Sequence, residues 1–224
     1  MNSLDRCLIR ERFLKVDTSN IADVLDEMGY PDQGLSAEFC PYPVTSSRLA
    51  GFAYTIRGQM TPYKLGGDTE KMQACNGIGP EEISVWSGGG EGVCYFGELI
   101  AVGMKEKGSV GALVDGGIRD VRWLKHHGFP VFARYRTPVQ SISRWKVNTW
   151  QIPISVAGAT SKYVIVTPGD FIIADDDGVI VIPREKIITV LERAERLTDK
   201  EVQIRRELQN GLSLADALAK FGHV

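Results

Sequence analysis

A glycine pair followed by two charged residues stands out mid-chain, where the sequence reads Asp115-Gly116-Gly117-Ile118-Arg119-Asp120. The planar guanidinium of Arg119 offers a fork of donors suited to a carboxylate or an enolate oxygen. The carboxylate of Asp120 is a hard oxygen ligand suited to a magnesium-like cation. The pair therefore predicts a site that binds a small oxo-acid together with a divalent metal ion. The alternative is that both residues only charge the first turn of a surface helix.

A second candidate segment precedes an apolar helical run and consists of Gly97, Glu98, Leu99 and Ile100. Backbone amides at a helix N-terminus have no partner inside the helix. Together with the helix dipole, they favour a carboxylate or a phosphate. We therefore expect this segment to hold a carboxylate of the substrate.

The elements around the two segments must bring them to one place. Gly108 can end the helix that starts near residue 97, residues 112–114 read as a short strand, and Arg119 begins another helical run. A helix, a strand and a second helix in this order place both loops at one edge. Near the end of the last helix, His126 and His127 are adjacent and point about 100° apart, so they favour charge at a helix end over a shared metal ion.

Composition predicts an ordinary globular protein without a strong electrostatic preference. The 224 residues are 43% hydrophobic and 24% charged, and 26 basic against 28 acidic side chains leave a net charge of −2. This balance gives no general reason to bind nucleic acid or an acidic membrane. No apolar run reaches the roughly 18 residues of a membrane span. The four cysteines are scattered without CxxC spacing, which favours reduced thiols and a cytoplasmic location.

The first half of the chain alternates helices and strands. An apolar face over residues 17–28 predicts a helix, and 49–57 and 83–86 read as strands. The polar, glycine-bearing segment 61–68 is expected to be a connection. It is either a lid over the site or a plain surface loop.

The second half is rich in strands, expected over 130–134, 139–145, 152–156, 164–166, 171–174 and 179–182. Asp175, Asp176 and Asp177 lack the spacing of a calcium loop and predict a turn with solvated charge. A long helix over 184–209 and a short one over 214–221 follow. We expect a single domain, 1–224, of mixed α/β layered architecture, with the C-terminal helices 184–224 at a subunit interface.

Taken together, Gly97-Glu98-Leu99, the twenty residues between Glu98 and Arg119, and the Asp115–Asp120 segment form a pattern. The pattern resembles the signature of the class II pyruvate aldolases that act on 4-hydroxy-4-methyl-2-oxoglutarate. The same family contains the regulators of ribonuclease E activity. Segments 18–29, 48–57, 130–134 and 168–184 also look like family stretches in family order. The resemblance implies an α/β/β/α swivelling-domain fold that assembles as a homotrimer or a hexamer.

The resemblance also implies an activity: cleavage of a 4-hydroxy-2-oxo dicarboxylate to pyruvate and a second oxo-acid with Mg²⁺ or Mn²⁺, and decarboxylation of oxaloacetate. Asp120 is expected to anchor the metal ion and Arg119 to stabilise the enolate oxygen. Glu98 stands where the aldolases generally carry Asp and the regulators carry Gly, so it keeps the acid that can position a proton-transferring water. Glu195 and Glu201 are candidates for a glutamate that reaches the neighbouring subunit's site.

Two other functions fit parts of the pattern. A non-catalytic regulator would bind a ribonuclease or another protein partner. Its version of the motif has an acidic residue three positions after Asp120, where this chain has Trp123. A third possibility is an aldolase-like enzyme for a different oxo-acid, such as one derived from a sugar, because the motif contacts only the pyruvoyl end of the substrate.

Overall fold

A strongly curved sheet organises the computed structural model, which describes residues 3–42, 48–64 and 66–222. The ends of the expected domain and of its C-terminal segment, residues 1–2 and 223–224, lie outside this description. The strands of the sheet are β1 (Cys40–Tyr42), β2 (Leu49–Met60), β3 (Glu82–Ser87), β4 (Cys94–Phe96), β5 (Gly111–Ile118), β6 (Val131–Arg136), β7 (Trp145–Trp150), β10 (Phe171–Asp175) and β11 (Gly178–Ile182). Their order is β1-β6-β5-β3-β2-β10-β11, with β4 paired to β5 and β7 paired to β2. The two remaining strands, β8 (Ile154–Ala157) and β9 (Tyr163–Val166), form a separate antiparallel pair.

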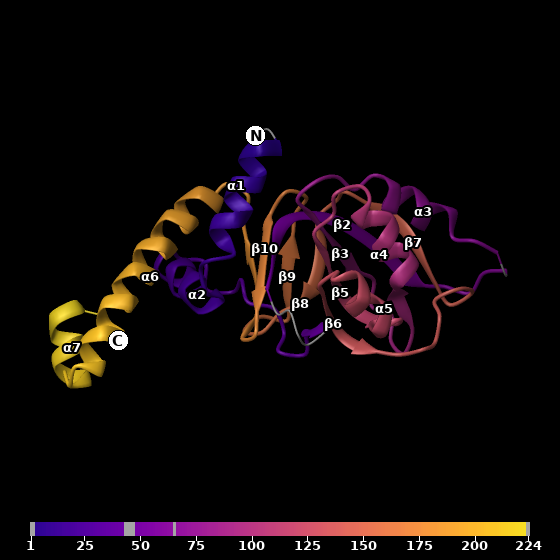
Figure 1. Ribbon diagram of the computed structural model, residues 1–224. Helices are drawn as coiled ribbons and strands as arrows, with labels where there is room; N and C mark the ends of the chain where they lie inside the picture. Colours follow the sequence, from indigo (N-terminus) through magenta and orange to yellow (C-terminus); the bar gives the residue numbers. More distant parts are fainter. Residues whose placement is uncertain (1–2, 43–47, 65, 223–224) are drawn as a thin grey trace.

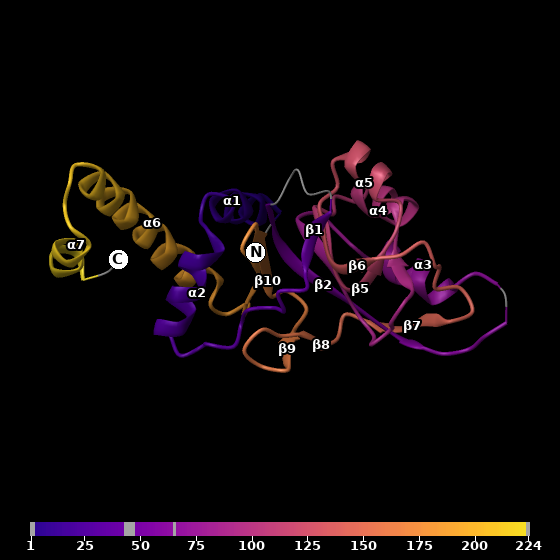
Figure 2. The same cartoon turned by 90° about the horizontal axis from the view of Figure 1, so that it is seen from below.

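Helices cover the sheet from two sides (Figure 1). One group is α1 (Ser3–Phe13), α2 (Thr18–Glu27) and α6 (Ile187–Gln209), and the other is α3 (Thr69–Asn76), α4 (Glu98–Lys105) and α5 (Val121–His127). The last helix, α7 (Leu214–Phe221), packs against α6. Both views show α6 and α7 extending away from the sheet (Figures 1 and 2). None of the helices in the described residues is long and apolar enough to cross a membrane.

Buried side chains form three separate clusters, as four layers require. Under α1, α2 and α6, Phe13 stacks on Phe171 with ring centroids 4.3 Å apart. Ile172 follows Phe171 on β10 but lies in a second cluster, enclosed by the strands, because successive strand residues point to opposite faces. In the third cluster, beside α3, α4 and α5, Tyr95 stacks on Trp145 at 4.2 Å. The predicted α/β/β/α layering is confirmed.

Several predicted boundaries are wrong. The strand expected over 112–114 continues to Ile118, because β4 pairs with its end and the Asp115–Ile118 segment belongs to the sheet. The strand expected over 139–145 instead begins at Trp145, after a turn. Helix α3 has no counterpart in the prediction, because its face lacks apolar periodicity and buries only Lys71 and Ala74. By contrast, 214–221 is helical over the predicted range.

The aspartate turn differs from its prediction at one residue. Asp176 and Asp177 are exposed, but Asp175 is buried, with 8% of its surface accessible. Its carboxylate accepts hydrogen bonds from the backbone N (2.8 Å) and the hydroxyl (2.6 Å) of Thr18 and from the backbone N of Asp177 (3.0 Å). The residue before α2, Asp17, makes no side-chain cap of its own. Asp175 therefore caps α2 from a strand far away in the sequence.

This contact predicts that Asp175→Ala lowers the free energy of unfolding by about 1–3 kcal/mol, because buried donors at the start of α2 lose their acceptor. Urea unfolding followed by circular dichroism measures the change. Asp176→Ala is the matched control and should stay within about 0.5 kcal/mol of the wild type, since its side chain is exposed. Equal losses of unfolding free energy in the two variants would contradict the capping role of Asp175.

Candidate active site

Parallel pairing of β4 with β5 brings the two predicted segments together. Cys94 lies opposite Gly117 and Phe96 opposite Ile118, and the backbone N of Arg119 donates to the carbonyl of Phe96 at 3.1 Å. The chain leaves β4 and enters α4 where it also leaves β5 and enters α5. The structure therefore contains the expected helix, strand and second helix, with both loops at one edge of the sheet.

Gly97 packs directly against the side chains of the second loop. A Cβ atom at this position would lie 2.7 Å from Oδ2 of Asp120 and 3.2 Å from Cγ of Arg119, so a side chain here would displace the Asp120 carboxylate from its position. The backbone N of Glu98 donates to Asp120 Oδ2 at 3.3 Å, so Asp120 partly caps α4. Among the described residues, the amides of the next two positions, Leu99 and Ile100, have no acceptor. They are available to an anionic ligand.

Asp120 has a left-handed backbone, with φ 60° and ψ 31°. This conformation directs its carboxylate toward α4 and toward Arg119, whose Nε lies 3.5 Å from Asp120 Oδ2. Both side chains are partly accessible, 43% for Arg119 and 38% for Asp120. Such exposure leaves both side chains accessible to a ligand.

The carboxylate of Glu98 has a partner that the sequence did not indicate. Its Oε1 lies 3.0 Å from Nε2 of His127, on α5. The carbonyl of His127 in turn accepts a hydrogen bond from Nζ of Lys105 at 2.6 Å. His127 was expected only to charge a helix end, but it also holds the acid at the start of α4. His126 instead packs its ring beside that of Trp123, at 5.8 Å.

A pocket of about 360 Å³ brings together Gly97, Leu99, Ile100, Arg119 and Asp120, whereas Glu98 and His127 are not among its lining residues. Its lining residues are Tyr63, Gly67, Asp68, Lys71, Met72, Cys94, Tyr95, Phe96, Gly97, Leu99, Ile100, Arg119, Asp120, Gln140, Ser141 and Ile142. A volume of this size suits a small organic ligand. The connection 61–68 borders the pocket through Tyr63, Gly67 and Asp68, while residue 65 lies outside the described part of the chain.

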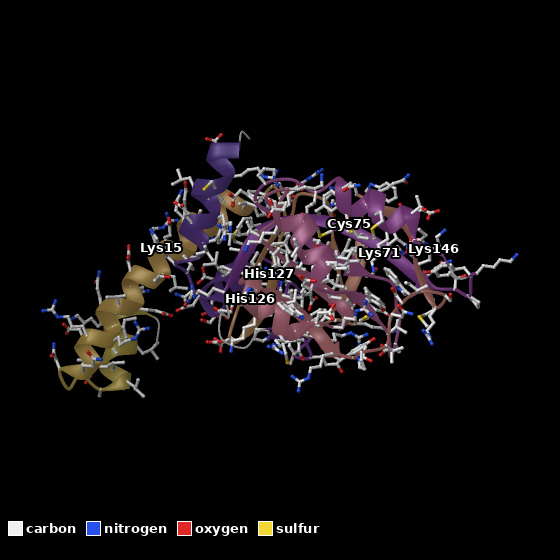
Figure 3. All side chains as sticks on the ribbon, turned by 45° about the vertical axis from the view of Figure 1, so that its right-hand side comes forward. Lys15, Lys71, Cys75, His126, His127 and Lys146 are labelled. Carbon is white, nitrogen blue, oxygen red and sulfur yellow. The ribbon has the colours of Figure 1, made fainter. Side chains whose placement is uncertain are left out.

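Among the described lining residues, Lys71 on α3 is the one that introduces a buried cation, and no pattern in the sequence indicated it. Only 9% of its surface is accessible, and its Nζ donates to the carbonyl of Tyr95. Burial lowers the pKa of Lys71, the carboxylate of Asp68 works in the opposite direction, and the nearby Arg119 guanidinium lowers it further. Figure 3 labels Lys71 in the body of the fold beside Cys75, another residue of α3.

Asp120 is the carboxylate of this pocket that could hold a metal ion, and this role stays a prediction. No group of three or more His, Cys, Asp or Glu side chains in the described residues forms a closed metal cage. Magnesium is usually bound through one or two carboxylates, with water and substrate oxygens completing its shell. The accessible carboxylate of Asp120, in the same pocket as the free amides of Leu99 and Ile100, is compatible with that set of ligands.

The two C-terminal glutamates lie on α6, and neither borders the pocket of its own chain. Glu195 makes two hydrogen bonds with the guanidinium of Arg12, at 2.8 and 2.6 Å. Glu201 accepts from the amide of Asn20 at 3.3 Å. Whether either glutamate serves a neighbouring subunit stays a prediction.

A family model described as RraA-like, Aldolase/RraA, matches residues 18–181 of the chain. A protein of Halalkalibacterium halodurans that is provisionally named 4-hydroxy-4-methyl-2-oxoglutarate aldolase is 28% identical to this chain. The match covers 95% of this chain and 94% of that protein. An uncharacterized protein of Methanocaldococcus jannaschii is 33% identical over 63% of this chain, and the match spans 61% of that protein's length. The crystal structure of Streptomyces coelicolor RraAS2, an unusual member of the RNase ES inhibitor RraA family, superposes with a TM-score of 0.74. The superposition covers 88% of this chain and 95% of the RraAS2 chain. Because the two sequences are only 23% identical, the likeness supports the fold alone.

The left-handed backbone at residue 120 predicts a difference between two substitutions. Asp120→Ala should lower the free energy of unfolding by about 1–2 kcal/mol, because alanine is disfavoured in this conformation and cannot accept from the Glu98 amide. Asp120→Asn should change it little, since asparagine tolerates the conformation and keeps an acceptor oxygen. Thermal unfolding measures both. Equal melting temperatures for the two variants would show that the backbone of residue 120 adjusts freely.

Proposed function

We propose a carbon–carbon lyase activity for this chain, which belongs to the RraA-like family of aldolases and RraA proteins. The reaction is divalent-metal-dependent aldol cleavage of a 4-hydroxy-2-oxo dicarboxylate to pyruvate and a second oxo-acid, with oxaloacetate decarboxylation as a side reaction. The observation that carries this proposal is the convergence of Arg119, Asp120 and the unpaired amides of Leu99 and Ile100 on one pocket. These groups can bind a 2-oxo acid and stabilise the negative charge that its oxo oxygen gains as the enolate forms.

Binding and orientation of the substrate fall to the backbone and to Arg119. The amides of Leu99 and Ile100 receive the carboxylate next to the 2-oxo group, where the helix dipole also favours a negative charge. The guanidinium of Arg119 donates to the 2-oxo oxygen, and these hydrogen bonds strengthen as the oxygen gains charge in the transition state. Asp120 holds Mg²⁺ or Mn²⁺, which supplies Lewis-acid polarisation of the same oxo group when bound.

Proton transfer is assigned to Glu98, which acts through a water molecule on the hydroxyl group of the substrate. The imidazole of His127 fixes the orientation of the Glu98 carboxylate through the 3.0 Å contact. A carboxylate held in this way has one oxygen left for the water. Decarboxylation of oxaloacetate needs no such step, because the substrate has no hydroxyl to deprotonate.

A second candidate is a non-catalytic regulator that binds a ribonuclease or another protein. The observation in its favour is apolar surface beside the site, where Leu99 is 80% and Trp123 51% exposed. The structural likeness to RraAS2 agrees with it at the level of the fold. Against it stands Trp123 itself, since the regulator version of the motif has an acidic residue there.

We also propose that the chain works as a homotrimer or a hexamer with the C-terminal helices at the interface. Val202 on α6 and Leu214 and Leu218 on α7 each expose more than half of their surface, which suits burial between subunits. In such an assembly a glutamate of α6, Glu195 or Glu201, would approach the neighbouring site. The mass of the purified protein in light scattering distinguishes these assemblies from a single chain.

The proposed reaction predicts metal-dependent release of pyruvate. A coupled assay with lactate dehydrogenase should detect turnover of a 4-hydroxy-2-oxo dicarboxylate and of oxaloacetate with Mg²⁺ or Mn²⁺ and none after chelation. Asp120→Asn, which keeps the fold in the prediction above, is the matched variant and should lose the metal-dependent rate. Full activity with chelator present would exclude the metal-dependent mechanism. Absence of turnover across a panel of 2-oxo acids would favour the regulator.

The role of Glu98 predicts that the two reactions respond differently to one substitution. Glu98→Gln should lower aldol cleavage by about 10²-fold or more, because the amide keeps the shape and loses the basicity. Oxaloacetate decarboxylation should fall much less. Glu106→Gln, at the other end of α4 and exposed, serves as the control and should leave both rates unchanged. Equal losses in both reactions would assign Glu98 to the carboxylate pocket instead.

A further inference from the structure

Lys71 has hydrogen-bonding capacity that no described residue of the chain uses. Its ammonium carries three donors, and in the described residues it makes one hydrogen bond, to the carbonyl of Tyr95. No carboxylate of the described residues lies within ion-pair distance of it. A buried ammonium without a counter-ion is costly, so its persistence in a ligand-sized pocket needs an explanation.

The nearest carboxylate is already occupied. Asp68 accepts from the backbone N of Lys71 at 3.0 Å, where it caps α3, and from the backbone N of Val147 at 3.0 Å, where it ties α3 to β7. Both of its oxygens are therefore engaged by backbone amides. The rings of Trp86 and Trp145, at 5.5 and 5.9 Å from the ammonium, compensate its charge only in part.

We propose that Lys71 binds the second carboxylate of a dicarboxylic 2-oxo acid, the one remote from the oxo group, and so selects dicarboxylates over monocarboxylates. This inference rests on the proposed function for the placement of the first carboxylate at the start of α4. Lys71 borders the same pocket as Arg119 and the α4 amides.

The two anion-binding groups lie near each other along the chain. Tyr95, whose carbonyl accepts from the ammonium of Lys71, lies four residues before Leu99. An extended chain advances at most about 3.6 Å per residue, so these four residues span at most about 14 Å. A carboxylate at the free donors of Lys71 would supply the missing counter-ion.

The lowered pKa of Lys71 has the same origin, because burial disfavours the charged ammonium as long as no anion accompanies it. A bound carboxylate acts in the opposite direction. The dicarboxylate and the charged form of Lys71 therefore stabilise each other.

The test compares two uncleavable probes by isothermal titration calorimetry in buffer with Mg²⁺. The probes are 2-oxoglutarate, which has a remote carboxylate, and 2-oxobutyrate, which has none. Wild-type protein should bind 2-oxoglutarate at least about tenfold more tightly. Lys71→Met should abolish this preference and leave the affinity for 2-oxobutyrate unchanged, while Lys71→Arg should retain part of the preference.

The control is Lys146→Met. Lys146, labelled near Lys71 in Figure 3, lies on β7 and pairs at 2.9 Å with Glu70, a residue next to Lys71. It is not among the residues that line the pocket. Its variant should keep the wild-type preference. Lys71→Met should melt at or above the wild-type temperature, because it removes an uncompensated buried charge.

Two results would overturn the inference. A wild-type protein without preference for 2-oxoglutarate overturns the inference even if no variant folds. A Lys71→Met variant that melts at a lower temperature and keeps the preference makes Lys71 a structural cation held by the tryptophans. Because neither probe is cleaved, the binding result is separate from catalysis. A preference for 2-oxoglutarate without pyruvate release in the coupled assay would support the Lys71 subsite and contradict the proposed lyase activity.

Discussion

The whole site depends on how closely the side chains of Arg119 and Asp120 approach the backbone at Gly97. Pairing of β4 with the last residues of β5 fixes the approach, and the missing side chain at Gly97 admits Asp120 Oδ2 into the space that a Cβ would fill. The helix amides, the guanidinium and the carboxylate then converge without any long connecting loop. Groups supported in this way by strand and helix termini hold their geometry better than groups on free loops.

Sequence patterns predicted this convergence because its determinants are local. The glycines, the short strand and the charged pair lie within one segment of chain. The family resemblance predicted the α/β/β/α order, while apolar periodicity predicted the individual helices and strands. The same periodicity placed α7 correctly and failed for α3, whose buried face contains a lysine. Asp115 to Ile118 looked like a loop because glycines are poor strand formers. In the fold Gly116 and Gly117 instead make room for the rings of Tyr95 and Tyr135.

The sequence did not reveal the polar contacts between distant segments. Lys71 meets the carbonyl of Tyr95 across 24 residues, His127 meets Glu98 across 29, and Asp175 meets Thr18 across 157. Each pair is set by the folding of the sheet, and nothing in the local composition distinguishes these residues from solvated charges. A sequence therefore indicates which groups can do chemistry, while the fold determines which partners restrain them.

The extension of α6 and α7 away from the sheet has a consequence for local opening of the chain. Helix α7 buries only Ala217 and is joined to α6 by the ion pair of Lys220 with Glu207, at 2.9 Å. A segment with so few buried contacts opens at a much lower free energy than the sheet does. In a single chain, amide hydrogens of α7 would exchange with solvent while those of β5 stay protected. Protection of α7 would then report directly that neighbouring chains have come together.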